Sequence, residues 1–257
     1  GVDVMIFDVS NATLYWDEWD VILDEMMRMK AEGNKVPQFC FWAFNGNVIT
    51  VVSQLYERYY KTRRSEDLWF RWQGRPLLLY NATPWMDANV GGGEKNAKDY
   101  PQEVKDFFTL RNMWWGYYTW GGERYVGGED KWSFGYDMHM EDVQKLTPLE
   151  RASRHNGEVE EMAVTPAQHP ITNVGKCWRP GTGEPALNGL DMPARAFVPA
   201  TGKEEADPVR WGIYFQDRWD EALQVDPPFI YLNDWNEWVA GRYVSGKDPG
   251  GHVPGPT

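Results

Sequence analysis

The first third of the chain alternates between short apolar runs and segments in which apolar residues have helical spacing. Segment 2–9 is predicted to be a strand, and 16–32 has apolar residues at the three- and four-residue intervals of a helix. Strand patterns at 36–44 and 76–81 follow, with a helical pattern at 48–63 between them. This alternation is typical of a parallel sheet and indicates the α/β class.

The rest of the chain continues the pattern less regularly. Segment 103–120 predicts a short helix or turn followed by a strand, and 160–166 predicts a shorter strand. Segment 209–223 is an aromatic-rich helical pattern that leads into a strand at 229–235. These patterns give about six strands, whereas a (β/α)8 barrel of the TIM type needs eight. We therefore expect such a barrel with its first strand absent or rearranged, or with a strand hidden in 165–207.

Length and charge bound the class of protein. A chain of 257 residues suffices for one barrel, so the prediction is a single domain over 1–257 with an irregular Pro- and Gly-rich insertion at about 165–207. The formal net charge of −12 disfavours nucleic acid or an anionic membrane surface as partner. No apolar run approaches the roughly 20 residues that span a bilayer. A neutral carbohydrate is a better match to this charge as a partner. A sulfated or uronic-acid polymer stays an alternative if arginines form a local basic pocket.

The segment that begins at Phe229 changes abruptly from apolar to polar. An apolar strand run is followed by Asn233, Asp234, Trp235, Asn236, Glu237 and Trp238. In a barrel of parallel strands, the groups that meet substrate lie where the strands end. Glu237 is therefore the first catalytic candidate. The two flanking indoles offer flat apolar faces that can stack on a pyranose ring.

Aromatic residues are frequent throughout the chain. The sequence holds 15 Trp, 13 Tyr and 11 Phe. Many stand beside Gly, Asn or Asp, which favours rings that line an open cleft. The alternative for any single ring is that it fills the core. A carbohydrate enzyme is the leading hypothesis.

Polar and aromatic residues also follow the other predicted strands. Asp8 closes the first strand and could orient a sugar hydroxyl, serve as a second carboxylate or cap the next helix. His169, in a loop after Thr165, could bind a hydroxyl or sulfate, although a lone histidine is more often a surface residue. The candidate substrate-binding residues are Trp42, Asn45, Asn81, Trp85, Trp120, Glu123, His169, Trp235, Asn236, Trp238 and Tyr243.

Two motifs resemble a known family. Segment 233–243, with Asn236-Glu237-Trp238 and Gly241, resembles the Trp-Asn-Glu-Trp-x-x-Gly segment of glycoside hydrolase family 71 and 99-like proteins. The opening of the chain, up to Phe7-Asp8, resembles an early strand of those proteins. The resemblance implies a (β/α)8 barrel that acts on polysaccharides. Ala240 stands where family 99 has a second glutamate, so that family's substrate and its mechanism through an anhydro sugar are not carried over.

Glycosidic hydrolysis normally needs two carboxyl groups, one to protonate the leaving oxygen and one to attack the anomeric carbon or activate water. We expect Glu237 to be the general acid, with Asp8 or Asp234 as the nucleophile or base. Glu123 and Asp137 are the other acids near predicted strand ends. For each possible partner of Glu237, a structural hydrogen bond or a helix cap is the alternative role.

Two other classes of function stay open. Because Ala240 replaces an expected carboxylate, the chain could be an inactive carbohydrate-binding barrel with stacked rings but no acid pair. A polysaccharide lyase would need a base and a group that neutralises the uronic acid, and His169 with Tyr243 or Arg242 could supply them. The order of preference is hydrolase, binding barrel, lyase.

No cofactor or metal is predicted. Asp130, Asp137 and Glu141 lie in an acidic stretch without regular calcium spacing, so a solvated loop is expected there. Cys40 and Cys177 imply neither a disulfide scaffold nor a zinc site.

The first residues already have the pattern of a buried strand and not that of a signal peptide, since acidic residues interrupt the apolar run. We therefore expect a piece of a longer chain. The expected location is secreted or periplasmic, with any signal peptide absent from this sequence.

Overall fold

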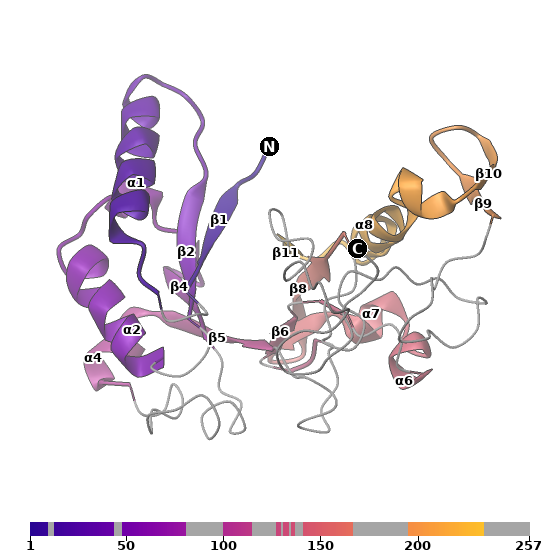
Figure 1. The fold of residues 1–257 in the computed structure, drawn as a ribbon. Coiled ribbons are helices and arrows are strands. Elements are labelled where there is room, and N and C mark those ends of the chain that lie inside the picture. Colours follow the sequence, from indigo (N-terminus) through magenta and orange to yellow (C-terminus); the bar gives the residue numbers. More distant parts are fainter. Residues whose placement is uncertain are drawn as a thin grey trace, which may run out of the picture. The chain divides into compact units, whose positions relative to one another are not determined.

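The chain divides into two compact units, Gly1–Met113 (unit 1) and Trp114–Thr257 (unit 2). A computed structural model describes residues 1–9, 13–43, 48–80, 100–114, 127–129, 131–133, 135–136, 141–166 and 195–233. Each unit contains helices and strands (Figure 1). The prediction of one domain over the whole chain stays a prediction.

Unit 1 is built from four parallel strands with a helical layer on one face (Figure 1). Its elements are β1 Val4–Asp8, α1 Trp16–Ala31, β2 Gln38–Ala43, α2 Val48–Leu55, the π-helical turn η1 Tyr56–Tyr60, the 3-10 turn η2 Glu66–Leu68, β3 Arg71–Trp72, β4 Arg75–Tyr80, α4 Gln102–Phe107 and β5 Thr109–Trp114. The four parallel strands follow the order β1, β2, β4, β5. The short β3 joins β4 as an antiparallel hairpin.

The helix α1 forms where the apolar spacing predicts it. Its residues Trp19, Leu23 and Met26 lie on one face and are buried. The helix ends at Ala31, and Gly33 follows the C-cap residue Glu32 with a φ of 86°, a left-handed conformation that glycine adopts without strain. The amides of Gly33 and Asn34 donate to the carbonyls of Lys30 and Met29, at 3.0 and 3.1 Å, which closes the last turn as a Schellman motif.

Aromatic rings dominate the core between the sheet and the helices of unit 1. Phe7 stacks on Trp19 with ring centroids 6.1 Å apart, and Phe41 contacts the same indole at 5.0 Å. Side chains alternate along a strand, so the residues on either side of Phe41 in β2 face the other side of the sheet. Cys40 and Trp42 on that side are buried as well. A strand apolar on both faces is typical of a parallel sheet, so the sequence pattern and the structure agree.

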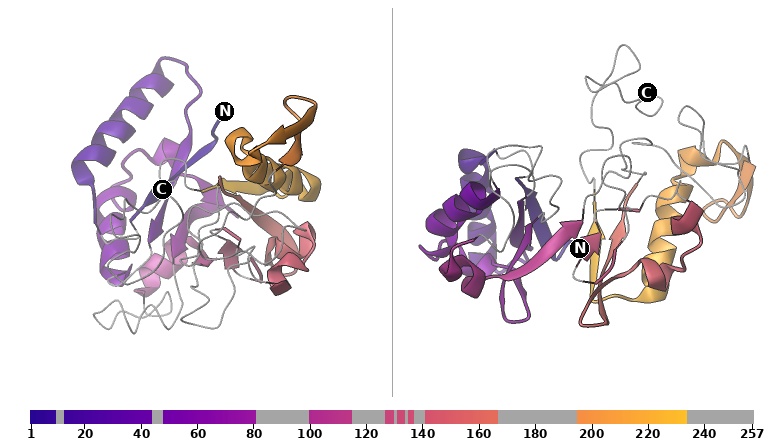
Figure 2. Two further views of the ribbon diagram at one scale, coloured as in Figure 1. Left: turned by 45° about the vertical axis from the view of Figure 1, so that its right-hand side comes forward. Right: turned by 90° about the horizontal axis from the view of Figure 1, so that it is seen from below.

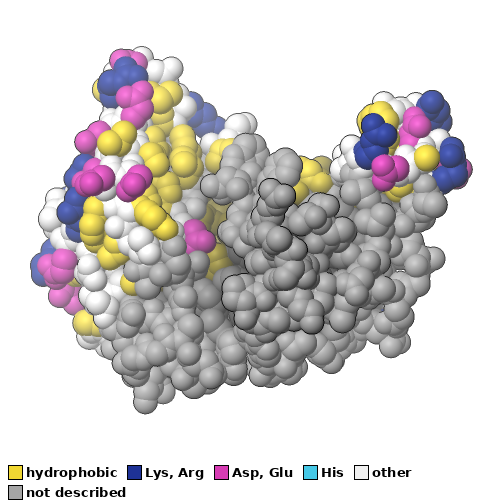
Figure 3. All heavy atoms as spheres, in the orientation of Figure 1, with side chains coloured by type: hydrophobic (Ala, Val, Ile, Leu, Met, Phe, Trp, Pro, Cys, Tyr) yellow, Lys and Arg dark blue, Asp and Glu magenta, His cyan; other side chains and the backbone are white. Residues whose placement is uncertain are grey.

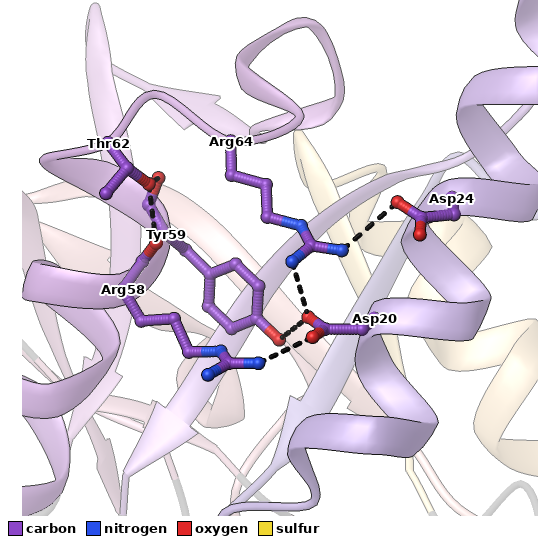
Figure 4. Close-up of polar contacts among 6 residues, drawn as sticks. All are labelled: Asp20, Asp24, Arg58, Tyr59, Thr62 and Arg64. Atoms are coloured by element: carbon purple, nitrogen blue, oxygen red, sulfur yellow. Dashed lines mark hydrogen bonds and ion pairs between the residues drawn. The ribbon is translucent and has the colours of Figure 1, made fainter.

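An ionic cluster joins α1 to the segment that follows α2 (Figure 4). The carboxylate of Asp20 accepts hydrogen bonds from Arg58 Nη2 at 2.6 Å and from the hydroxyl of Tyr59 at 2.8 Å. Arg64 lies 3.1 Å from Asp20 and also 3.1 Å from Asp24. Burial opposes the ionisation of Asp20, but the hydrogen bonds of Tyr59 and Arg58 and the charge of Arg64 hold its pKa below the usual range.

We expect the substitution Asp20→Asn to lower the free energy of unfolding by about 1–3 kcal/mol, because an amide cannot serve two guanidinium groups and a phenol equally well. The matched control is Asp24→Asn. The side chain of Asp24 is 72% exposed, against 22% for Asp20, and a contact of this exposed kind contributes roughly 0–1 kcal/mol. Urea unfolding followed by tryptophan fluorescence measures both. Equal losses in the two variants would contradict this account.

The described part of unit 2 contains a small sheet of β7, β8 and β11, a separate hairpin and the helices α6, α7 and α8. Its elements are β6 Lys131–Ser133, α6 Glu141–Gln144, α7 Pro148–Arg151, β7 Ser153–His155, β8 Glu158–Val164, β9 Arg195–Val198, β10 Lys203–Ala206, the 3-10 turn η4 Pro208–Trp211, α8 Ile213–Val225 and β11 Phe229–Leu232. β8 is central, with β11 parallel on one side and β7 antiparallel on the other. α8 packs against β8. β9 and β10 form a two-stranded antiparallel sheet. The sheet order is β1, β2, β4, β5, β6 for one sheet and β11, β8, β7 for another.

The structure is a mixed α/β fold with a mostly parallel sheet, as the strand-helix alternation predicts. The predicted helices at 16–32, 48–63 and 209–223 correspond to α1, α2 with η1, and η4 with α8. The closed eight-stranded barrel stays a prediction. None of the described helices is both long and apolar enough to cross a membrane.

The segment 165–207 does contain strands, which was one of the predicted alternatives. These are β9 and β10, which pair with each other as an antiparallel hairpin, and residues 167–194 lie outside the described residues. The short strands β3, β6 and β7 were not predicted. Each has only two or three residues, which is too short for a periodic pattern.

Candidate functional site

The carboxyl ends of the strands of unit 1 bring two predicted site residues together. Asp8 is the last residue of β1 and is exposed, whereas its neighbours in the strand are partly or fully buried. In the parallel ladder Asp8 is in register with Trp42. The amide of Val9 continues this ladder by donating to the carbonyl of Trp42 at 3.0 Å. An acid and an indole therefore stand side by side at the sheet edge where a parallel fold carries its chemistry.

Asp8 is not the N-cap residue of α1, because that position is Tyr15. The other roles of Asp8, namely substrate contact, catalysis and a structural hydrogen bond, stay predictions.

The row that begins at Asp8 continues across the sheet. Trp42 is in register with Leu79, and Leu79 is in register with Arg111. These side chains share the face opposite the helical layer, since each register step keeps the same face. Arg111 is buried, and its Nη1 donates to the carbonyl of Leu110 at 3.0 Å. The face thus carries an acid and a guanidinium among apolar groups.

Trp42 has no exposed ring face in this structure, because its side chain is 1% exposed. Stacking of a sugar on this indole would require it to be uncovered. Other aromatic residues of unit 1, such as Phe39, Tyr60 and Phe108, are also buried. For these rings the core-filling role is the one that the structure shows.

The carboxyl end of the β8–β11 pair is the corresponding edge of unit 2. The amide of Asn233 donates to the carbonyl of Val164 at 3.0 Å and extends the parallel ladder by one residue. Asn233 and Thr165 are therefore neighbours just beyond the strands, and both are buried. The hydroxyl of Tyr231 donates to Oδ1 of Asn233 at 3.1 Å, which fixes this amide. Asp234, the next residue in sequence, follows directly from this edge.

Most of the predicted site lies outside the described residues. These residues are Asn45, Asn81, Trp85, Trp120, Glu123, His169, Asp234, Trp235, Asn236, Glu237, Trp238 and Tyr243. Their roles stay predictions. In the part of the chain that the structure describes, no group of three or more His, Cys, Asp or Glu could hold a metal ion.

β8 carries a pair of buried carboxyl groups that were not predicted as site residues. Glu160 and Glu161 are consecutive, so their side chains point to opposite faces of the strand. Oε2 of Glu160 accepts from the indole of Trp132 at 2.9 Å. Oε2 of Glu161 accepts from the amide of Ser133 at 2.9 Å and from the hydroxyl of Ser153 at 2.5 Å. Two adjacent glutamates before the apolar run 162–164 were the available signal.

The environment of Glu161 keeps it protonated. Complete burial raises its pKa, and the charge of Glu160 adds to this, while the hydrogen bonds of Ser153 and Ser133 oppose it; the resulting pKa is about 8. Within the described residues, Oε1 of Glu161 has no hydrogen-bond partner. Glu161 on β8 thus joins β8 to Ser133 of β6 and to Ser153 of β7, so its first role is structural.

No protein-family model, no curated protein and no solved structure matches this chain. A function therefore has to be argued from the residues of the chain itself.

Proposed function

We propose that this protein is a glycoside hydrolase that cleaves a polysaccharide or oligosaccharide, and that its strands belong to a (β/α)8-type barrel. One observation supports this most. The parallel strand β11 ends at Leu232, so the sequence Asn233-Asp234-Trp235-Asn236-Glu237 begins at the carboxyl end of a parallel pair. Asp8, the other proposed carboxylate, also ends a parallel strand.

The proposed chemistry uses two carboxyl groups. Glu237 protonates the glycosidic oxygen as the bond to the anomeric carbon breaks. In one route Asp8 or Asp234 attacks that carbon, and water, deprotonated by Glu237, then hydrolyses the glycosyl-enzyme ester with overall retention. In the other route the same carboxylate takes a proton from the water that attacks the carbon, which gives inversion. Asp8 is exposed and is thus reachable by a substrate. The indoles of Trp235 and Trp238 would hold the sugar ring, and the buried amide of Asn233 would support the start of this segment.

The test is release of reducing sugar from a panel of neutral, uronic and sulfated polysaccharides. We expect Glu237→Gln to lower kcat by about 10²- to 10⁴-fold, the usual contribution of one general acid. Glu158→Gln is the matched control, because Glu158 is an exposed glutamate at the start of β8. The chemical change, from a carboxyl group to an amide, is the same in both variants. Full activity of Glu237→Gln would contradict the proposed role.

A comparison of Asp8→Asn with Asp234→Asn identifies the second carboxylate. The substitution at the true partner should remove release, and the other should leave most of it. Binding of a glycan without release by the unsubstituted chain would instead favour the inactive carbohydrate-binding barrel, with Ala240 as the reason.

A further inference from the structure

Two aromatic side chains are exposed in one small part of unit 2. Phe197 on β9 is 54% exposed, and Trp211 at the end of η4 is 47% exposed. Of the large apolar side chains that are exposed among the described residues, the only other aromatic one is Tyr15. Exposed rings are thus concentrated in the segment 195–211, whereas the rings of unit 1 mostly fill its core.

The fold places these two residues in one substructure. Along β9 the side chains alternate, so Arg195 and Phe197 are exposed while Ala196 and Val198 are buried. Phe197 is in register with Glu204 on β10, which is also exposed. η4 begins two residues after β10 and lies against β9. The turn that ends at Trp211 therefore lies beside the strand that carries Phe197.

The hairpin and η4 lie at the functional end of unit 2. α8 starts directly after Trp211 and Gly212, and only residues 226–228 join it to β11. So short a connection makes α8 and β11 antiparallel, and the first turn of α8 lies at the end where β11 finishes. Figure 2 (right) shows the hairpin and the start of α8 at the same end of unit 2 as the tip of β11. The hairpin and η4, which carry the exposed rings, are therefore at the end of unit 2 where β11 finishes.

The charge of this surface is balanced. The segment 195–211 holds three basic residues, Arg195, Lys203 and Arg210, and three acidic ones, Glu204, Glu205 and Asp207. Figure 3 shows side chains of both signs beside apolar ones on this part of unit 2. The chain as a whole has a net charge of −12. A locally neutral segment with exposed aromatic rings fits a neutral polymer rich in hydroxyl groups better than a charged one.

We propose that Phe197 and Trp211 form an auxiliary binding surface for a neutral polysaccharide chain. The rings would stack on the C–H faces of sugar units, and the flanking charged groups would bind hydroxyls. The surface would hold the polymer at the end of unit 2 where the proposed catalytic segment begins. This inference rests on the proposed function and names its substrate class.

The experiment measures binding and turnover separately. Binding is measured by affinity electrophoresis of the full chain carrying Glu237→Gln in gels with each neutral polysaccharide. We expect Trp211→Ala or Phe197→Ala in that background to weaken binding to the retained polymer about tenfold, equivalent to about 1.4 kcal/mol. In the chain with Glu237 intact, the same changes should lower kcat/KM on the polymer and leave a short oligosaccharide unaffected. Leu223→Ala and Tyr15→Ala are controls, since both residues are exposed and lie elsewhere.

Three results would overturn the inference. The first is unchanged retention of the Trp211→Ala and Phe197→Ala variants while polymer is still cleaved, which leaves the proposed function intact. The second is equal loss on the short and the long substrate, which would show a fold defect or a role at the catalytic centre. The third is unchanged glycan binding by variants that elute from size-exclusion chromatography as a smaller species than the unsubstituted chain, which would assign the rings to self-association. Absence of both retention and sugar release would remove the proposed function as well.

Discussion

Replacement of Glu221 by alanine is expected to lower the free energy of unfolding by about 3–5 kcal/mol, the usual cost of removing one partner of a buried ion pair. Glu221 lies on α8 between two arginines. Nη2 of Arg151 is 2.6 Å from its Oε2, and Nη2 of Arg218 donates to its Oε1 at 2.8 Å. The side chains of both arginines are only 3% exposed. The substitution would leave two guanidinium ions buried without the anion that they share.

The remaining contacts of the two arginines replace only part of this interaction. Nη1 of Arg151 donates to the carbonyl of Leu146 at 2.6 Å, and its guanidinium lies 5.6 Å from the ring centroid of Tyr136. Arg218 lies 4.9 Å from the ring of Tyr214. These contacts stay in the variant, but a carbonyl dipole or a ring stabilises a buried cation less than a carboxylate does.

Urea unfolding at neutral pH measures this loss. The control is Asp220→Ala, because Asp220 is exposed on the same helix and contacts only Gln216 among the partners that we describe. We expect Glu221→Gln to fall between the two variants, since it keeps an acceptor oxygen but not the charge. A loss below about 1 kcal/mol for Glu221→Ala would mean that this cluster behaves as an exposed ion pair.

Helices and strands with a regular apolar pattern could be predicted from the sequence, because the spacing of the apolar residues within the segment indicates the type of element. α1 is the clearest case, since Trp19, Leu23 and Met26 recur on one face and Gly33 follows the last turn. The parallel strands could be predicted because both of their faces are apolar. β6 and β7 could not, since three residues give no measurable period. The hairpin of β9 and β10 was hidden by the Pro- and Gly-rich segment around it.

The candidate site was predictable only where it depends on strand ends. The exposure of Asp8 at the end of β1 follows from the strand pattern, and so does the position of Asn233. The burial of Trp42 does not follow, because it depends on what covers the face of the sheet. The burial of Glu161 is the feature least accessible from the sequence. Its partners Ser153 and Ser133 are 8 and 28 residues away in sequence, so only the fold makes this glutamate a buried acid.

The burial of Glu161 should make the stability of the protein depend on pH. Its pKa is about 8 in the folded protein, against an ordinary value of 4.5. Between these two values the folded chain binds a proton that the unfolded chain has released. The contribution of Glu161 to stability is therefore fully present below about pH 4.5 and is lost as the pH rises to about 8. This direction is opposite to that of a salt-bridged carboxylate such as Asp20.

The size of the effect follows from the same values. Each pH unit in this interval should remove about 1.4 kcal/mol, or on the order of 5 kcal/mol over the whole interval. The charged groups near Glu161 do not offset this loss. Glu160 is another acid, and the pKa of Tyr136 is raised well above its usual value, first by burial and then by the charge of Glu161. Arg151 interacts with Tyr136 and Glu221 rather than with Glu161.

The substitution Glu161→Gln isolates the pH-dependent contribution of Glu161 to the free energy of unfolding, because an amide keeps the shape of the protonated acid and cannot ionise. We expect the difference in free energy of unfolding between Glu161→Gln and the unsubstituted chain to grow in favour of the variant from pH 5 to pH 8 and then to level off. Urea unfolding at half-unit steps of pH, with Glu158→Gln as the exposed control in the same strand, gives this curve. A pH-independent difference would show that Glu161 is ionised in the folded protein. In that case the amide of Ser133 and the hydroxyl of Ser153 would have to stabilise a buried anion on their own.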